Sequence, residues 1–484
     1  MPLRSLMVEW DRPDKAGGYE DMNAVDLGEL RARDFGYLDA EGHTYLDYTG
    51  AGLAPASLVR ASAERITGSV FGNPHSESPA SRASGDLLAR ARAAVLRHFH
   101  ADPAEYTVVF TANATAALRL IGESYPFAPG GRLVMLLDNH NSVNGLREYA
   151  RAGGAKTEYV PVHGQELAID EERLHTALTA RRRRRGRGLL AYPAQSNFTG
   201  VRHSLDWIAT AHEHGYDVLL DAAAFVPTNP LDLSRHHPDF TVVSWYKVFG
   251  YPTGIGSLVV RREALARLRR PWFSGGTIYA ASAQAQWHVL ADGEAAFEDG
   301  TVNFLSIPDI TAGLDWIDTI GMDHVHDHVT RLTAQLLAGV TELRHSDGSP
   351  MARVYGPTGT GPTRGGTVAL NLLDADGRVI DERVVSQDSA DHRISLRYGC
   401  FCNPGAGEAA FALPLRSLRS AARKPLGSLE EYLTLLGLPS AGAVRVSVGV
   451  SSQPRDVETF LEFVANTYRD RVPTAAGLAD RAGC

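Results

Sequence analysis

Two residues with reactive side chains, Lys247 and Asp221, each stand at the end of an apolar, β-rich run of the sequence. Lys247 comes three residues after the run FTVVS and precedes a turn rich in glycine and proline, and Asp221 closes the run YDVLL. In open α/β folds, ligands bind at the carboxyl ends of the strands. A lysine there is either an ordinary surface residue or a desolvated, reactive amine. The aspartate is either a helix cap or ion-pair partner, or the functional partner of that amine.

A lysine and an aspartate on neighbouring strand ends also form the pair that pyridoxal phosphate requires. The lysine bonds the aldehyde of the cofactor, and the carboxylate keeps the pyridine nitrogen protonated so that the ring can accept electrons. Residues 110–124 add a strand, a turn of small residues and a helix. The backbone N–H groups near Ala114 and Thr115, with the Thr115 hydroxyl, are suited to holding a phosphate at the helix N-terminus.

Two further strand ends carry side chains suited to a cofactor ring or a substrate. His140 closes the segment LLDNH, and its flat imidazole either stacks on a ring or is an ordinary hydrogen-bonded loop histidine. Gln195 and Asn197 follow the run GLLAY, and their amides can bond a ring hydroxyl or a substrate carboxylate. All these groups stand in the chain order that a pyridoxal-phosphate site needs.

The three cysteines divide into a close pair and a terminal residue. Cys400 and Cys402 are separated by one residue, which disfavours a disulfide between them, and Cys484 makes the number odd. We therefore expect no disulfide framework and a reducing compartment. The close pair lies in a turn-forming loop, GCFCNPG, with Arg393 and Arg397 upstream to stabilise a thiolate. The alternative is that these cysteines are small buried hydrophobic residues.

Seven short β-rich runs between Tyr106 and Val260 alternate with helical stretches, which indicates an α/β fold. Most of the connections are long enough for a crossover helix, which implies parallel neighbours. The connection from Ser244 to Gly256 is short and rich in glycine and proline. The last strand is therefore predicted to run antiparallel in a mixed, mostly parallel, seven-stranded sheet.

The pattern changes after Val260 to amphipathic helices and a few strands, which predicts a smaller α+β C-terminal lobe. The helices are expected over residues 281–297, 308–343 and 454–469. The chain is thereby divided into an N-terminal segment, a large domain, a small domain and a mobile tail, at 1–45, 46–305, 306–474 and 475–484.

Composition excludes several classes of partner. The net charge is −8 and no apolar run is long enough to span a membrane, so we expect a soluble, cytoplasmic protein that binds neither nucleic acid nor membrane. The arginine run 181–185 is interpreted as a solvated loop. His324 and His328, with Asp323 and Asp327, have metal-ligand spacing, but a solvent-facing helix explains them, so no metal is predicted.

The order of the motifs resembles the amino-terminal desulfurase part of the molybdenum cofactor sulfurases. That family belongs to the class V aminotransferase and cysteine desulfurase group of pyridoxal-phosphate enzymes, which have the fold type I transferase architecture. The likeness spans about residues 40–470. It is carried by TANATAAL, DNHNSVNGLREYA, AYPAQSNFTGV, LLDAAAFVPTNPLDLS, VSWYKVFGYPTGIG, FEDGTVNFLSI, RYGCFCNPGAG and GAVRVSVG.

The resemblance implies a role for each candidate residue. Lys247 would hold pyridoxal 5'-phosphate, Asp221 would pair with its ring nitrogen, and His140 would stack on the ring. The residues implied to hold the phosphate are Thr115, Ser244 and, from the second subunit of a homodimer, Thr301. The residues implied to hold the substrate's carboxylate are Asn197, Arg445 and Arg397. The family's nucleophile lies five residues after the equivalent of Arg397, which selects Cys402 and leaves Cys400 as an auxiliary or structural thiol.

The implied reaction moves sulfur from L-cysteine through a Cys402 persulfide to an acceptor and releases L-alanine. Two features depart from the family: Gly407 stands where the motif has its next cysteine, and the sequence stops before the family's β-rich domain that binds the molybdenum cofactor. The acceptor, that cofactor or a carrier protein, is therefore open. The alternatives are a C–S lyase, epimerase or aminotransferase with Cys402 as a bystander, and an inactive scaffold that partners a sulfur carrier. The intact Lys247 and Asp221 disfavour the scaffold.

Overall fold

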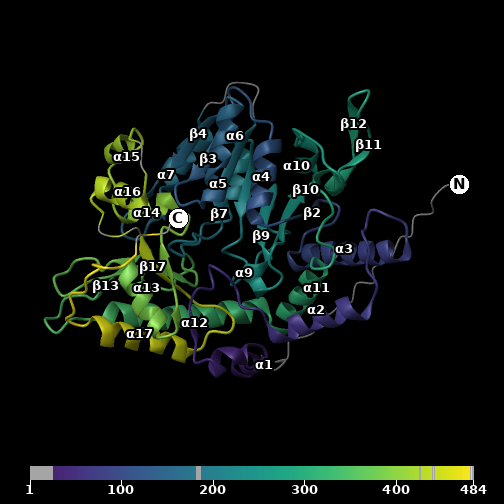
Figure 1. Ribbon diagram of the computed structural model, residues 1–484. Helices are drawn as coiled ribbons and strands as arrows, with labels where there is room; N and C mark the ends of the chain where they lie inside the picture. Colours follow the sequence, from purple (N-terminus) through teal and green to yellow (C-terminus); the bar gives the residue numbers. More distant parts are fainter. Residues whose placement is uncertain are drawn as a thin grey trace.

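A computed structural model describes residues 25–180, 187–424, 427–438, 440, 442–479 and 481. Its centre is a seven-stranded sheet in the order β2-β10-β9-β8-β7-β3-β4 (Figure 1). The strands, in chain order, are β2 (Tyr106–Thr111), β3 (Arg132–Leu136), β4 (Lys156–Val160), β7 (Gly188–Pro193), β8 (Tyr216–Asp221), β9 (Phe240–Ser244) and β10 (Gly256–Arg261). Each of the seven predicted runs forms one of these strands.

Strand directions in the sheet confirm the predicted mixture. β10 is antiparallel to both of its neighbours, β2 and β9. The other pairs, from β9 through β8, β7 and β3 to β4, are parallel. Between β9 and β10 the chain has only the short helix α9 (Trp245–Phe249) and a Gly/Pro turn, so it returns beside β9 in the opposite direction.

Helices cover both faces of this sheet (Figure 1). One face is covered by α4 (Ala114–Ser124), α6 (Leu146–Ala152) and α10 (Arg262–Arg267). The other is covered by α3 (Pro79–His98), α7 (Glu171–Thr179) and α8 (Trp207–Glu213). Because both sides of each central strand are buried, these strands are continuous apolar runs rather than alternating ones.

The small lobe is built on a four-stranded antiparallel sheet in the order β13-β14-β17-β16. Its strands are β13 (Ala352–Tyr355), β14 (Thr367–Leu372), β16 (Arg397–Gly399) and β17 (Ala443–Ser447), and its main helices are α12 (Met322–Glu342), α13 (Glu382–Asp391) and α17 (Pro454–Tyr468). Near the start of the described chain, β1 (Thr44–Tyr45) pairs in parallel with β15 (Ile394–Ser395) of this lobe. The N-terminal segment is thus joined to the small lobe, while the division of the chain into four parts stays a prediction.

The remaining elements connect these layers. They are α1 (Leu27–Ala40), α2 (Ala56–Gly68), α5 (Asn141–Asn144), β5 (Val162–His163), β6 (Ala168–Ile169), α14 (Pro404–Ala410), α15 (Leu415–Ala421) and α16 (Leu429–Leu436).

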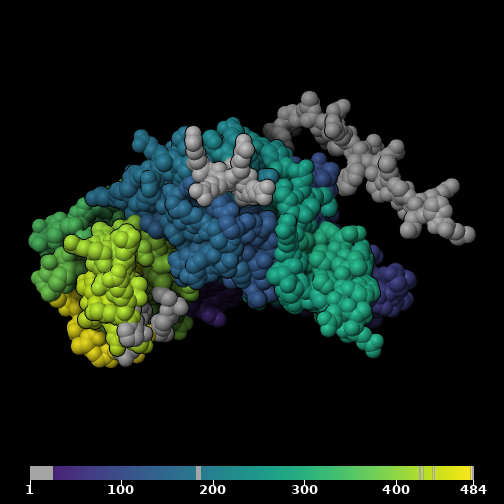
Figure 2. Space-filling view, turned by 90° about the horizontal axis from the view of Figure 1, so that it is seen from above, coloured from purple at the N-terminus to yellow at the C-terminus, as the bar shows by residue number. Residues whose placement is uncertain are grey.

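Two helix predictions are wrong. Residues 281–297 were expected to be helical, but β11 (Ile278–Ser282) and β12 (Trp287–Leu290) form a hairpin, followed by a 3-10 turn over Gly293–Phe297. The hairpin lies at the opposite end of the molecule from the small lobe (Figure 2). The helix expected over 308–343 is divided into α11 (Pro308–Ile320) and α12 by Gly321, whose φ of 84° interrupts a helix. The arginine run 181–185 lies outside the described residues.

Candidate active site

A cavity of about 610 Å³, part of it open to solvent, lies at the carboxyl ends of the central strands. The turns after β2, β3, β7 and β9 and the last residue of β8 contribute its lining. It brings together eight residues predicted from the sequence: Ala114, Thr115, His140, Gln195, Asn197, Asp221, Ser244 and Lys247. Parallel strands present their carboxyl ends at one edge, which is why residues so far apart in the sequence meet here.

The amine and the carboxylate of the predicted pair share this cavity. Asp221 is the last residue of β8 and is 8% exposed, and its Oδ1 accepts a hydrogen bond from the backbone N of Ala223 at 3.1 Å. Lys247 stands in α9, directly after the adjacent strand β9. Burial lowers the pKa of the Lys247 amine below its ordinary value, and the negative charge of Asp221 opposes this shift. The amine therefore loses its proton more readily than an exposed lysine does.

Hydroxyl groups gather at the N-terminus of α4. Thr115 Oγ1 lies 2.8 Å from Ser142 Oγ, and Ser244 lines the same cavity at the end of β9. The helix is capped by Asn113, whose side chain accepts from the backbone N of Ala116 at 2.9 Å. Ser142 was missed by the sequence analysis, although it lies two residues after His140 in the same motif. Hydroxyls beside a helix N-terminus suit a phosphate.

His140 is held as a neutral, flat ring. Its Nδ1 accepts a hydrogen bond from the backbone N of Ser142 at 3.1 Å, so its proton belongs on Nε2. Burial lowers the pKa of His140, the nearby charges of Lys247 and Arg445 lower it further, and Asp221 opposes them. A neutral imidazole on the cavity wall can stack on an aromatic ring without adding charge.

The chemistry of these groups fits pyridoxal phosphate. The carboxylate of Asp221 suits a protonated pyridine nitrogen, the amine of Lys247, whose pKa is lowered by burial, suits the aldehyde, and the hydroxyls of Thr115, Ser142 and Ser244 suit the phosphate. In the described part of the chain, no group of histidine, cysteine, aspartate and glutamate side chains could hold a metal ion. His328 is buried rather than solvent-facing, and its Nε2 lies 2.8 Å from the carbonyl O of Ser452.

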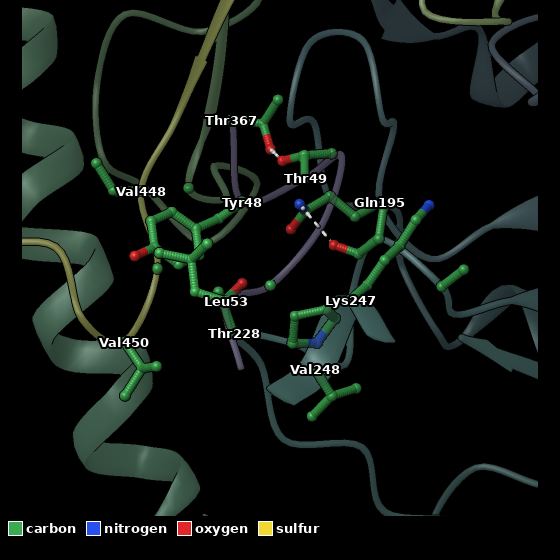
Figure 3. Close-up of a pocket in the computed structure, with 16 residues that line it drawn as sticks. Tyr48, Thr49, Leu53, Gln195, Thr228, Lys247, Val248, Thr367, Val448 and Val450 are labelled. Carbon is green, nitrogen blue, oxygen red and sulfur yellow. Dashed lines mark hydrogen bonds between the residues drawn. The ribbon is translucent and has the colours of Figure 1, made fainter. Parts of the chain in front are cut away.

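Lys247 also borders a second space of about 490 Å³, where three parts of the chain meet (Figure 3). The stretch just after β1 contributes Tyr48 and Thr49, and the small lobe contributes Thr367, whose Oγ1 lies 2.5 Å from Thr49 Oγ1. The Lys247 side chain extends past Gln195, away from Tyr48 (Figure 3). Gln195 itself donates through Nε2 to the carbonyl O of Ala224 at 3.0 Å. The lysine is therefore enclosed on this side by both lobes.

The loop of the cysteine pair packs against the large domain beside this cavity. Cys402 is a free, partly buried thiol, and its carbonyl O accepts from the backbone N of Asn141 at 2.6 Å. Cys400 is disulfide-bonded, which overturns the expectation of a chain without disulfides. In the described part of the chain, the residues that line the Lys247 cavity do not include Cys402.

The two arginines implied to hold a substrate carboxylate differ in burial. Arg445 is 3% exposed, and its Nη2 lies 2.7 Å from Asp47 Oδ1 while Nη1 donates to the carbonyl O of Asn197 at 3.0 Å. Burial lowers the pKa of Arg445, and Asp47 opposes this. The guanidinium of Arg397 is largely exposed and lies 4.0 Å from Asp47 Oδ2. Arg445 is thus a buried cation and Arg397 an exposed one, and neither is among the described residues that line the Lys247 cavity.

Thr301 is not brought to the Lys247 cavity of its own chain. It lines a different cavity, with Thr111 and Ala116, and its Oγ1 accepts from Asn73 Nδ2 at 3.2 Å. Its implied role needs a second copy of the chain and stays a prediction.

Among the described helices, none is long and apolar enough to cross a membrane.

The fold and this set of side chains are those of a pyridoxal-phosphate enzyme. The family model for class V aminotransferases matches residues 44–460, and the chain belongs to that family. It is similar to a molybdenum cofactor sulfurase of Bos taurus, with 34% identity over 461 residues that cover 91% of this chain and 52% of the relative. The chain therefore spans about half the length of that relative.

Solved structures show the same fold. An apo cysteine desulfurase from Thermococcus onnurineus NA1 superposes with a TM-score of 0.76 at 24% identity, over 93% of this chain and 99% of that one. A cystine C–S lyase in complex with its product, cysteine persulfide, superposes with a TM-score of 0.67 at 18% identity, over 90% and 100%. At these identities the likeness establishes the architecture, and the reaction must be argued from the site.

Proposed function

We propose that this chain is a pyridoxal-phosphate-dependent cysteine desulfurase. It takes sulfur from L-cysteine onto Cys402, releases L-alanine and passes the sulfur to the molybdenum cofactor or a carrier protein. The observation that carries the proposal is a free thiol beside the Lys247 cavity: Cys402 is tied through its carbonyl O to Asn141, the residue after His140. The similarity to the longer molybdenum cofactor sulfurase supports it.

The chain's own residues divide the work at the substrate. Pyridoxal phosphate, when bound, supplies an electron sink that stabilises negative charge on the substrate's carbon atoms. The buried cation of Arg445 binds the substrate's carboxylate, since a carboxylate and a guanidinium form strong, directional hydrogen bonds. Lys247 takes the proton from the α-carbon, because its lowered pKa leaves the amine deprotonated more often.

Sulfur transfer then needs only the thiol of Cys402. Its thiolate attacks the sulfur of L-cysteine, an S–S bond forms, and the bond between that sulfur and the β-carbon breaks. The electron pair of the broken bond stays on the β-carbon, which takes up the proton that the Cys402 thiol gave up and becomes a methyl group. Lys247 returns its proton to the α-carbon, which completes L-alanine. Cys402 is left as a persulfide, so atoms and electrons balance without an external oxidant or reductant.

A C–S lyase is the second candidate, and one observation favours it. Cys402 is not among the described residues that line the Lys247 cavity. A reaction at Lys247 in which Cys402 takes no part therefore agrees with the observed position of the loop. Such an enzyme would release sulfide or a persulfide together with a keto product, instead of L-alanine.

Mass spectrometry after L-cysteine is added to the holoenzyme tells the two candidates apart. We expect one additional sulfur on Cys402 and equimolar L-alanine. Cys402→Ser should form no persulfide, while Cys400→Ser, which removes only the disulfide-bonded neighbour, should still form it on Cys402. Sulfide or pyruvate released at an unchanged rate by Cys402→Ser would overturn the desulfurase proposal and favour the lyase.

We also propose that the active enzyme is a cytoplasmic homodimer in which Thr301 of one subunit reaches the phosphate site of the other. Two observations support a second copy: Thr301 lies outside its own Lys247 cavity, and the β11–β12 hairpin exposes Tyr279, Trp287 and Val289. Sedimentation at low concentration should find a dimer. A fully active monomer would contradict this proposal.

A further inference from the structure

Two asparagine side chains, Asn403 and Asn197, hold the Cys402 loop against the large domain. Asn403 is fully buried, and its Nδ2 donates to the carbonyl O of Asp138 at 2.6 Å and to Asn197 Oδ1 at 2.9 Å. Asn197 in turn donates through Nδ2 to the carbonyl O of Phe401 at 2.7 Å. We call these two residues the asparagine latch. The amide of Asn197, expected to bind substrate, is thus occupied by the loop.

The latched loop has a backbone that its residues do not favour. Phe401 and Cys402 have φ values of 54° and 53°, in the left-handed region that disfavours residues with a Cβ atom. Two such residues in succession persist only where surrounding contacts hold them. Loss of the latch therefore allows the loop to relax toward ordinary backbone conformations.

Arg445 connects the latch to the place where a carboxylate binds. Its guanidinium carbon lies 4.8 Å from the centre of the Phe401 ring, and its Nη1 donates to the carbonyl O of Asn197. Among the described residues, its buried Nε has no hydrogen-bond partner. A carboxylate that binds this cation arrives beside the Asn197 amide. A carboxylate is a stronger acceptor than the carbonyl of Phe401.

We propose that the asparagine latch keeps Cys402 out of the cavity until the substrate's carboxylate releases it. The incoming carboxylate takes the Nδ2 donor of Asn197 from Phe401, the latch opens, and the relaxed loop carries the thiol toward the substrate's sulfur. Asn403 is then a positioning residue, since its side chain binds Asn197 and the backbone of Asp138 and not the substrate. This inference rests on the proposed function, because it needs an amino acid at Arg445.

Hydrogen–deuterium exchange of residues 399–403 in the holoenzyme tests the latch. The ligand is L-alanine, which has the carboxylate but no sulfur, and its binding is followed separately by the absorbance of the cofactor. In the unmodified enzyme we expect L-alanine to speed deuterium exchange of the loop about tenfold. This is the effect of losing one hydrogen bond, because the carboxylate of L-alanine competes with the carbonyl O of Phe401 for the Asn197 donor. Ethylamine, which has the amine but no carboxylate, should leave the exchange slow.

Two variants separate the latch from the stability of the lobe. Asn403→Asp keeps the shape and the oxygen that caps α14 by accepting from Ala406 N at 3.1 Å, but it loses the Nδ2 donor. Its loop should exchange fast without ligand and respond little to L-alanine. Asn371→Asp is the matched control: this buried asparagine accepts from Tyr355 OH and donates to the carbonyl O of Gly442. It should behave like the unmodified enzyme.

The outcomes also separate this inference from the proposed function. If L-alanine changes the cofactor absorbance but the loop exchanges no faster, the carboxylate does not open the latch and the inference is wrong. Slow exchange in Asn403→Asp would equally overturn it. If L-alanine leaves the absorbance unchanged, amino-acid binding itself fails, and the exchange of Asn403→Asp still decides whether the latch holds the loop.

Discussion

The two reactive side chains of the site are held in different ways. Lys247 follows a central strand, β9, and both lobes enclose it. Cys402 lies in a loop that is held by hydrogen bonds from asparagine side chains, by one backbone contact with Asn141 and by the disulfide of Cys400. The lysine is fixed by the sheet, whereas the cysteine is fixed in part by side-chain hydrogen bonds that a ligand can replace.

This difference matches the chemistry asked of each side chain. In the proposed reaction, Lys247 acts at one place, on a carbon atom of the bound substrate, so a rigid position favours its role. In the same proposal, Cys402 reaches the substrate's sulfur and then presents a persulfide to an acceptor, which requires two positions. Substitutions at Lys247 and Asp221 should therefore affect the rigid side, one at Gly405 the loop side, and one at Gly407 neither.

Removal of the lysine should have the largest effect. Lys247→Ala should abolish the yellow chromophore of the bound cofactor and lower turnover by about 10⁴-fold, since both attachment and proton transfer are lost. Absorbance and alanine production measure the two effects. Lys156→Ala, which removes an exposed lysine in β4, is the control and should change neither. Full activity in Lys247→Ala would remove the basis of the proposed function.

A single methyl group added at Gly405 should disturb the Cys402 loop. A Cβ atom on Gly405 would lie 1.9 Å from the carbonyl O of Leu137, which is backbone and cannot move aside cheaply. Gly405→Ala should therefore displace the start of α14 and the adjacent asparagine latch. We expect sulfur transfer to fall by about 10²-fold, the usual effect of misplacing a reacting group by about 1 Å. Unchanged cofactor absorbance would show that the Lys247 side is intact, and unchanged persulfide formation would contradict the prediction.

The pH dependence of the reactivity of Lys247 tests how burial and Asp221 set the pKa of its amine. An amine reacts when neutral, so the burial that lowers the pKa of Lys247 moves its reactive range to lower pH than that of free lysine, about 10.4. Asp221 raises this pKa, so Asp221→Asn should move the range lower still. Acetylation of Lys247 in cofactor-free protein, followed by mass spectrometry against pH, measures both. A shift upward in Asp221→Asn would show that the aspartate charge does not reach the lysine.

The same contrast explains what the sequence predicted. Lys247, Asp221 and His140 were found because strand ends meet at one edge, so a local pattern places distant residues together. The latch is not predicted by the sequence, because Asn197 and Asn403 are 206 positions apart and no local pattern indicates that their side chains bind one another. The sequence predicts a helix over residues 281–297, where alanines and glutamines favour a helix, but β11 and β12 form a hairpin over 278–290. Cross-strand pairing such as Ser282 with Trp287 determines its structure instead.

The smallest effect is expected at Gly407, where the resembled family has a cysteine. This glycine lies within α14, two residues after Gly405, yet an added Cβ would meet nothing closer than a ring carbon of Phe198 at 3.8 Å, which is an ordinary contact. Gly407→Ala should stabilise the protein by about 0.5–1 kcal/mol, because alanine loses less backbone freedom in a helix. Thermal unfolding measures this, and persulfide formation should stay unchanged. A loss of sulfur transfer in Gly407→Ala comparable to that in Gly405→Ala would mean that α14 tolerates no side chain along this face. It would then be wrong that the start of α14 packs too tightly for a methyl group while Gly407 has room for one.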